Sequence, residues 1–155
     1  MTLGNTASWL MFIGIAVNAA IPPLHAWLSD AYPKATVTGA VFLSAFTTKA
    51  AVYVLLRVFP GWEILVFLGT AMALYGVIYA VLVNDIREIL AYHIISQVGY
   101  MVLALALFTP LAVAAGIFYI VHHIVVKTNL FFAAGLIAAS GRSERLERLG
   151  GLATA

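Results

Sequence analysis

The stretch ILVFLGTAMALYGVIYAVLVN, residues 64–84, contains no Asp, Glu, Lys or Arg. About 20 apolar residues in a helix cross the roughly 30 Å hydrocarbon core of a bilayer, so this stretch indicates a transmembrane helix. The whole chain agrees, since its 155 residues are 64% hydrophobic and only 9% charged. Soluble domains carry about 25% charged residues. The composition therefore excludes a soluble globular domain, a disordered chain and a free nucleic-acid-binding module.

Four further apolar stretches predict membrane-crossing helices on both sides of this one. They cover residues 7–28, 36–59, 89–108 and 111–140, and Pro110 separates the last two. Pro22-Pro23 interrupts the first helix and makes it discontinuous. We predict an all-α membrane protein of about five transmembrane helices, with residues 1–140 as the membrane domain and 141–155 as a cytoplasmic loop or tail.

The basic residues of the loops predict an orientation in the cell (inner) membrane. Five of them fall on the same face if the helices alternate in direction: Lys34, Arg87, Arg142, Arg145 and Arg148. The opposite face has only Arg57 near it. Because loops rich in Lys and Arg face the cytoplasm, we expect the N-terminus outside and the tail in the cytoplasm.

Several kinds of site are excluded by residue counts. The chain has no cysteine, which rules out disulfides, Cys-ligated zinc, iron–sulfur clusters and thiol catalysis. A net charge of +2 is too small for a basic nucleic-acid surface. These counts therefore exclude Cys-based cofactor and metal sites and argue against a nucleic-acid partner.

Small residues on the third predicted helix form a candidate packing surface. Gly69, Ala73, Gly76 and Ala80 recur at spacings of four and three, which suits the close approach of a second helix in lipid. The alternative is chance in a chain rich in Ala and Gly.

Lys49 lies near the middle of the predicted helix 36–59. An ionisable group at the bilayer centre costs about 2.5–3.5 kcal/mol on insertion scales, which makes it a functional candidate. Such a lysine could bind and release a proton as its surroundings change. The alternative is a lysine satisfied by carbonyls and hydroxyls, because Thr47 and Thr48 adjoin it.

Lys127 is the second charged residue within an apolar run. Tyr119 and His123 precede it at spacings of four, so the three side chains share one face of a helix. A row of Tyr, His and Lys could pass a proton along that face. The alternative is a polar face that packs against a partner helix.

Further polar residues lie near the predicted helix break and the membrane interface. Asn18 precedes Pro22-Pro23 by one turn, and His25 and Asp30 follow it. Broken helices of this kind line ion and substrate sites in transporters. His93 lies shortly after the charged stretch 85–88, where a simple interface location is the other interpretation.

Five segments together resemble one family of membrane subunits. They are PLHAWLSDA (23–31), TKAAVYVLLR (48–57), NDIREILAY (84–92) with SQVGYM (96–101), HIVVKTNLF (123–131), and the loop elements GR (141–142) and LGGL (149–152). The same motifs occur in the same order in antiporter-like proteins. These are the proton-pumping subunits of respiratory complex I, the large subunits of Mrp sodium/proton antiporters, above all the D-type one, and subunits of membrane-bound hydrogenases.

The resemblance implies a position within a larger fold and roles for particular residues. Members of this family have about fourteen helices, of which this chain would cover about a third, so we expect a fragment or a split gene product. Lys49 matches the lysine of the family's eighth helix, and Lys127 and His123 match those of its eleventh. Tyr119 stands where some members have a histidine. Asn18 stands where the family has its most characteristic lysine, and an amide cannot take up a proton.

Three functions remain open on the sequence. The first is proton or sodium/proton translocation in a respiratory or Mrp-type complex with other membrane subunits, for which the resemblance implies no cofactor and no metal. The second is a non-pumping structural or assembly subunit, which Asn18 favours. The third is haem-based electron transfer through His93, His122 and His123, in which the two lysines have no role. No hydrolase motif such as H-E-x-x-H or G-x-S-x-G is present.

Overall fold

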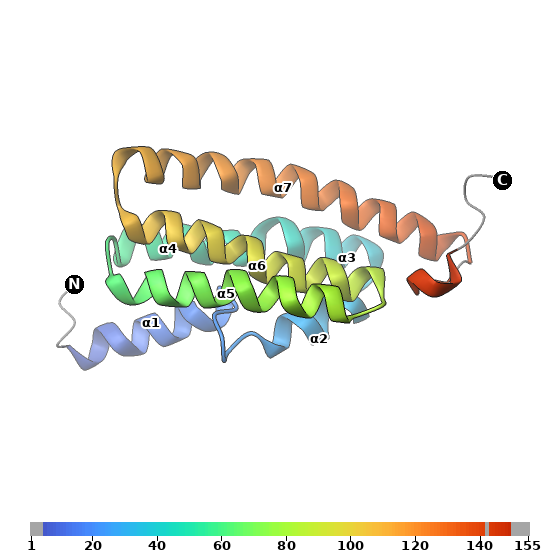
Figure 1. Cartoon of the computed structure of the whole chain (residues 1–155), viewed down its shortest axis with the longest axis horizontal. Coiled ribbons are helices and arrows are strands. Elements are labelled where there is room, and N and C mark those ends of the chain that lie inside the picture. The colour runs from blue at the N-terminus through green and yellow to red at the C-terminus, as the bar shows by residue number, and fades with distance from the viewer. Residues whose placement is uncertain (1–4, 142, 150–155) are drawn as a thin grey trace.

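The computed structural model describes residues 5–141 and 143–149, and every regular element in these ranges is helical (Figure 1). This confirms the predicted all-α fold. The elements are α1 (Thr6–Asn18), α2 (Ala26–Lys34), α3 (Val37–Phe42), the π-helical turn η1 (Leu43–Thr47), α4 (Thr48–Val58), α5 (Glu63–Leu82), α6 (Ile86–Leu107), α7 (Pro110–Ala139) and the short 3₁₀ turn η2 (Leu146–Arg148).

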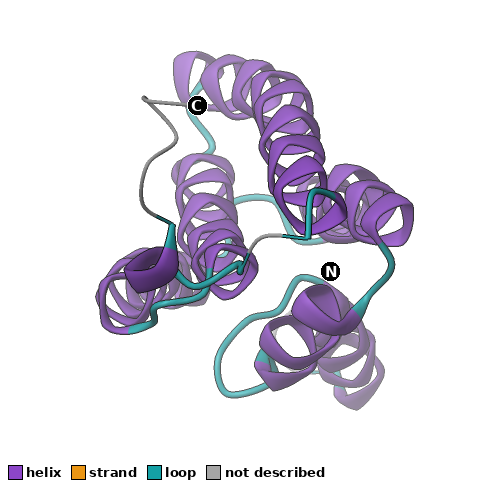
Figure 2. Cartoon of the chain, turned by 90° about the vertical axis from the view of Figure 1, so that its right-hand side faces the viewer, coloured by secondary structure: helices purple, strands orange, loops and turns teal. Residues whose placement is uncertain are grey.

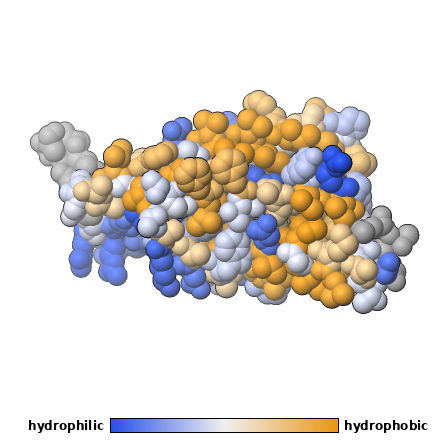
Figure 3. Space-filling view, turned by 180° about the vertical axis from the view of Figure 1, so that it is seen from behind, coloured by the Kyte–Doolittle hydropathy of each residue, from blue (hydrophilic) through white to orange (hydrophobic). Residues whose placement is uncertain are grey.

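Four helical runs in the described part of the chain are long and apolar enough to cross a membrane. They are α5, α6, α7 and the continuous run Val37–Val58, which contains α3, η1 and α4. The apolar helix α1 is shorter. Figure 3 shows a surface that is largely hydrophobic, with hydrophilic residues in separate groups that are most extensive toward the left of the view. The architecture is therefore that of a multi-helix membrane protein.

The first predicted helix is discontinuous, as expected from Pro22-Pro23. Helix α1 ends at Asn18 and α2 begins at Ala26, and Ala20 between them has a φ of 57°. A break in a membrane helix leaves backbone carbonyls that need other donors. One of them is satisfied here, because the indole Nε1 of Trp27 donates a hydrogen bond of 2.7 Å to the Val17 carbonyl. A side chain of α2 thus holds the two halves together.

Helices α5 and α6 approach each other so closely that glycine is required at their contact. A Cβ atom at Gly76 would lie 2.4 Å from the backbone nitrogen of Ser96, and one at Gly99 would lie 2.6 Å from the Gly69 carbonyl. Ser96 Oγ donates a hydrogen bond of 2.9 Å to the Ala73 carbonyl across the same interface. The small residues of α5 therefore form a packing surface for α6.

Arg87 joins three connections at one end of the molecule. Its guanidinium donates to the carbonyls of Ala35 (3.1 Å) and Pro33 (3.4 Å), and it forms an ion pair of 3.1 Å with Glu144. The α2–α3 connection, the α5–α6 loop and the segment after α7 therefore meet at the right-hand end of Figure 1. Figure 2 views the molecule from this end, nearly along the helix axes. Arg142 and residues 150–155 of the predicted tail, with part of its GR and LGGL motifs, lie outside the described residues.

The Arg87–Glu144 pair gives a first testable prediction. In a Glu144→Gln variant, Arg87, which is only 8% exposed, loses its carboxylate partner. Hydrogen bonds to charged groups are worth about 1.5–3 kcal/mol, so we expect a lower melting temperature for the purified protein. Asp30→Asn on the exposed face of α2 is the matched control and should leave the melting temperature unchanged. Equal melting temperatures for both variants would show that the pair does not stabilise this end.

Candidate functional site

Lys49 lies at the start of α4, directly after η1. Only 3% of the residue is exposed. Its Nζ donates hydrogen bonds to the Ser44 carbonyl (2.6 Å) and to Thr48 Oγ1 (3.2 Å). A π turn widens a helix and shifts its hydrogen bonds from the fourth to the fifth residue, and such turns are frequent at functional sites. Here the turn places a backbone carbonyl where it can accept from a buried ammonium group.

Lys127 and His123 are buried on one face of α7. Lys127 is 1% exposed, and its Nζ donates to the Leu90 carbonyl of α6 over 3.4 Å. His123 is 4% exposed, and neither of its ring nitrogens has a hydrogen-bond partner among the described residues. The half-buried Tyr119 lies one turn earlier, with its ring centre 6.3 Å from that of His123. The two ring nitrogens of His123 can therefore still form hydrogen bonds, which no described residue supplies. Leaving such buried groups without partners costs free energy.

These polar groups come together from three helices. The charges of Lys49 and Lys127 are close enough to act on each other, and both act on His123. The charge of Lys127 also acts on His93 of α6, whose Nε2 lies 3.5 Å from Gln97 Nε2. Neither lysine forms an ion pair with a carboxylate of residues 5–141 or 143–149. The cluster is therefore a group of basic side chains from α4, α6 and α7, of which Lys49, Lys127 and His123 are buried and His93 is half-buried.

Other residues singled out in the sequence lie elsewhere. Asn18 is exposed at the end of α1, and Asp30 is exposed on α2. His25 is half-buried at the helix break, where its Nε2 lies 2.7 Å from the hydroxyl of Tyr75 on α5. His122 is exposed on α7, although its neighbour His123 is buried. Of the residues near the helix break, His25 thus forms a polar contact with α5.

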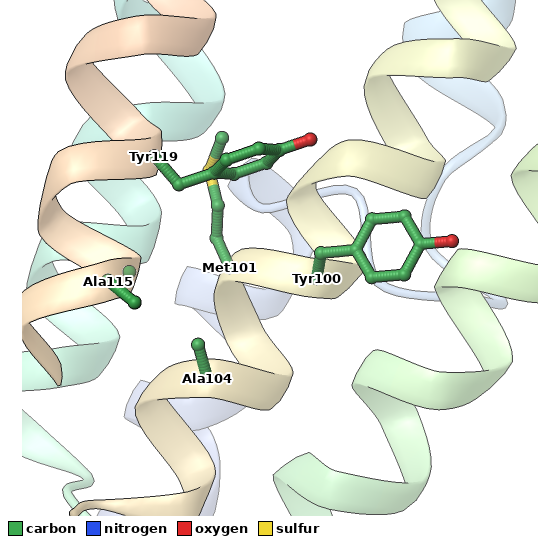
Figure 4. A pocket seen from close by; sticks show the side chains of 6 residues that line it. Tyr100, Met101, Ala104, Ala115 and Tyr119 are labelled. Carbon is green, nitrogen blue, oxygen red and sulfur yellow. The ribbon is translucent and has the colours of Figure 1, made fainter. Parts of the chain in front are cut away.

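A pocket of about 240 Å³ lies between α6 and α7 beside Tyr119 (Figure 4). Tyr119 reaches from α7 over Met101 of α6, whereas Tyr100 points away from α7. The remaining lining residues are small: Ala104, Ala115 and Gly116. The pocket therefore borders the Tyr119 end of the row that continues to His123 and Lys127.

Two groups that position Lys49 or its helix turn were not predicted from the sequence. The Ser44 carbonyl holds the Lys49 ammonium, and Tyr32 donates a hydrogen bond of 2.8 Å to the adjacent Leu43 carbonyl. No sequence pattern identifies a backbone acceptor, because every residue has one. For Tyr32 the signal was a lone hydroxyl within the DAYP stretch, residues 30–33, and nothing in the pattern connected it with Lys49.

Comparison with known proteins places the chain in a family. The family described as NADH:quinone oxidoreductase/Mrp antiporter, transmembrane, matches residues 2–155. The D-type subunit of the Na⁺/H⁺ antiporter of Alkalihalophilus pseudofirmus is 37% identical over 158 residues, which cover 96% of this chain and 32% of that protein. The N-type subunit of the NADH-quinone oxidoreductase of Desulforudis audaxviator is 33% identical, with 93% and 31% covered.

A solved structure of a related protein has the same fold as this chain. A chain of the Mrp complex from Dietzia sp. DQ12-45-1b superposes with a TM-score of 0.89 at 39% identity, over 96% of this chain and 29% of that chain. The chain spans about a third of the length of the relatives it matches. Those relatives are subunits of multi-subunit membrane complexes. The chain thus belongs to the NADH:quinone oxidoreductase/Mrp antiporter family of membrane proteins, as its motifs led us to expect.

Proposed function

We propose that this chain is part of an ion-translocating, antiporter-like subunit, in which Lys49 and Lys127 carry protons across the centre of the membrane. The observation that carries the proposal is the pair of buried lysines on different helices, whose charges act on each other. Because no described carboxylate neutralises either of them, a proton on one lysine disfavours a proton on the other. That mutual exclusion allows a charge to move stepwise.

The proposed route connects polar side chains of α4 and α7. Protons would pass between Lys49, intervening water and Lys127 with His123, and then along α7 to Tyr119. His123 suits an intermediate position because its free ring nitrogens could each accept or donate a proton. A charge change in a neighbouring subunit would drive the steps electrostatically, since Coulomb forces are strong at low dielectric. The transported ions would be protons, or sodium ions in exchange for protons.

The surroundings of the route are part of the proposal. We place residues 1–140 in the cell (inner) membrane in contact with lipid, with the N-terminus outside and residues 141–155 at the cytoplasmic face. The meeting of the basic connections around Arg87 at one end supports a common side for them. Other membrane subunits would cover the polar positions that remain exposed, such as Asn18.

A second candidate is a structural or assembly subunit without ion transport. Asn18 favours it, because it replaces the family's characteristic lysine and its amide cannot exchange a proton. In this case the close α5–α6 contact and the polar cluster would serve packing alone.

Ion flux in vesicles separates the two candidates. Inverted vesicles would be prepared from cells that express the full-length protein with its partner subunits, and from cells that lack it. After a pH gradient is imposed, the gradient should dissipate faster in vesicles that contain the protein than in those that lack it, either without added Na⁺ or when Na⁺ is added. Vesicles that contain the assembled complex but keep the same gradient as the protein-free ones would support the structural role and contradict translocation.

A further inference from the structure

Tyr32 of α2 reaches the π-helical turn from the other side of the lysine cluster. The residue is fully buried, at 0% exposure. Its hydroxyl donates a hydrogen bond of 2.8 Å to the Leu43 carbonyl. Leu43 and Thr47 are the first and last residues of η1. The phenol group of Tyr32 thus holds the first residue of the turn.

The carbonyl that Tyr32 contacts is next to the one that holds Lys49. Leu43 O accepts from Tyr32, and Ser44 O accepts from Lys49 Nζ over 2.6 Å. The two carbonyls belong to planar peptide units that meet at the Cα of Ser44, so only the φ and ψ of Ser44 separate their directions. The hydrogen bond made by Tyr32 thus lies one peptide unit from the carbonyl that accepts from Lys49.

The ring of Tyr32 also contacts the helix that carries Lys127. Its centre lies 6.0 Å from the ring centre of Phe131, which is buried on α7 one turn after Lys127. Trp27, which holds α2 to the end of α1, packs on Tyr32 with ring centres 6.2 Å apart. Tyr32 therefore connects the second half of the broken helix, to which it belongs, with the turn that positions Lys49 and with the helix of Lys127.

We propose that Tyr32 is a positioning residue that couples the second half of the broken helix to the hydrogen-bond acceptor of Lys49. A displacement of α2 would pull the Leu43 carbonyl through the Tyr32 hydroxyl and so turn the neighbouring Ser44 carbonyl away from the ammonium. The inference rests on the proposed function, because it matters for transport only if Lys49 exchanges protons. The positioning role belongs to the Tyr32 hydroxyl and not to its ring, because a phenylalanine ring would fill the same space without the hydroxyl.

The substitution Tyr32→Phe tests the hydroxyl, with Tyr53→Phe as the matched control. Tyr53 is exposed on α4, and its hydroxyl accepts only from Arg57 among the described hydrogen bonds. In vesicles that contain the full-length protein, we expect Tyr32→Phe to lower the maximal ion flux about fivefold, equivalent to ~1 kcal/mol. We also expect the midpoint of its pH profile to be displaced by about half a unit. Tyr53→Phe should match the unmodified protein in both.

The pH profile distinguishes positioning from simple packing. Lys127 of α7 is the titratable group whose charge bears on Lys49, and the charge of Lys49 in turn bears on His123. Both residues remain unchanged in these variants. A lower flux with an unmoved midpoint, or an unchanged flux, would overturn the proposal. Should Tyr32→Phe fail to assemble, Trp27→Phe removes the indole donor that holds α2 to the Val17 carbonyl. An unmoved midpoint in that variant would also overturn the proposal. If Lys49→Met transports normally, the proposed function itself fails, whatever Tyr32 does.

Discussion

Replacing Lys49 by Met should lower ion translocation at least about tenfold, or ~1.4 kcal/mol in barrier height, without loss of assembly. Methionine keeps a long unbranched side chain in the space that Lys49 fills, but it cannot carry a proton. The Ser44 carbonyl and the Thr48 hydroxyl then lose the ammonium that they bind at 2.6 and 3.2 Å. The measurement is the rate of pH-gradient dissipation in vesicles with equal amounts of the assembled protein.

Two comparison variants sharpen this test. Lys34→Met makes the same substitution at an exposed lysine at the end of α2 and should transport at the normal rate. Lys49→Arg keeps a positive charge that does not leave at accessible pH, so it should be as inactive as Lys49→Met. Normal transport by Lys49→Arg would mean that the site needs a fixed charge and not an exchangeable proton.

The second large effect is expected at the α5–α6 contact. Gly76→Ala would place its Cβ 2.4 Å from the backbone nitrogen of Ser96 and 2.6 Å from the Tyr92 carbonyl. Backbone atoms cannot move aside as a flexible side chain can, so the helices must separate. Overpacking of this kind costs about 1–3 kcal/mol. We expect a lower melting temperature and a smaller amount of assembled protein in the membrane.

Gly14→Ala on α1 is the matched control. A Cβ at Gly14 would meet no atom within 4 Å, and alanine favours a helix by about 0.8–1 kcal/mol over glycine. This variant should therefore be as stable as the unmodified protein or slightly more stable. Equal stability of Gly76→Ala and Gly14→Ala would contradict the close packing of α5 on α6.

The broken first helix and the lysine-bearing helices could be anticipated from the sequence for clear physical reasons. Pro22-Pro23 lacks the backbone donors that a helix needs, and a lysine stands out in an otherwise apolar run because its burial is costly. The length of the break, from Asn18 to Ala26, could not be anticipated. It depends on tertiary contacts such as the hydrogen bond from Trp27 to Val17.

The local environment of the lysine cluster could not be predicted from the sequence either. The sequence contains no signal for η1, because a π turn inside a longer helix leaves the apolar pattern almost unchanged. For His93 the sequence leaves open a simple location at the membrane interface, and the structure brings it within the influence of Lys127. Whether His93 lies near Lys127 depends on the distance between α6 and α7, which the spacing of residues along one helix does not reveal. The roles of Lys49, Lys127, His123, Tyr119 and Asn18 in transport stay predictions.

The most direct test of the account is the ion flux of the double variant Lys49→Met/Lys127→Met beside its two single variants. If both lysines lie on one route, each single substitution interrupts it, and the double variant should be no less active than either. All three should give only the background flux of protein-free vesicles, while Lys34→Met retains the normal rate. Normal flux through the assembled double variant would show that ions do not pass by way of these lysines.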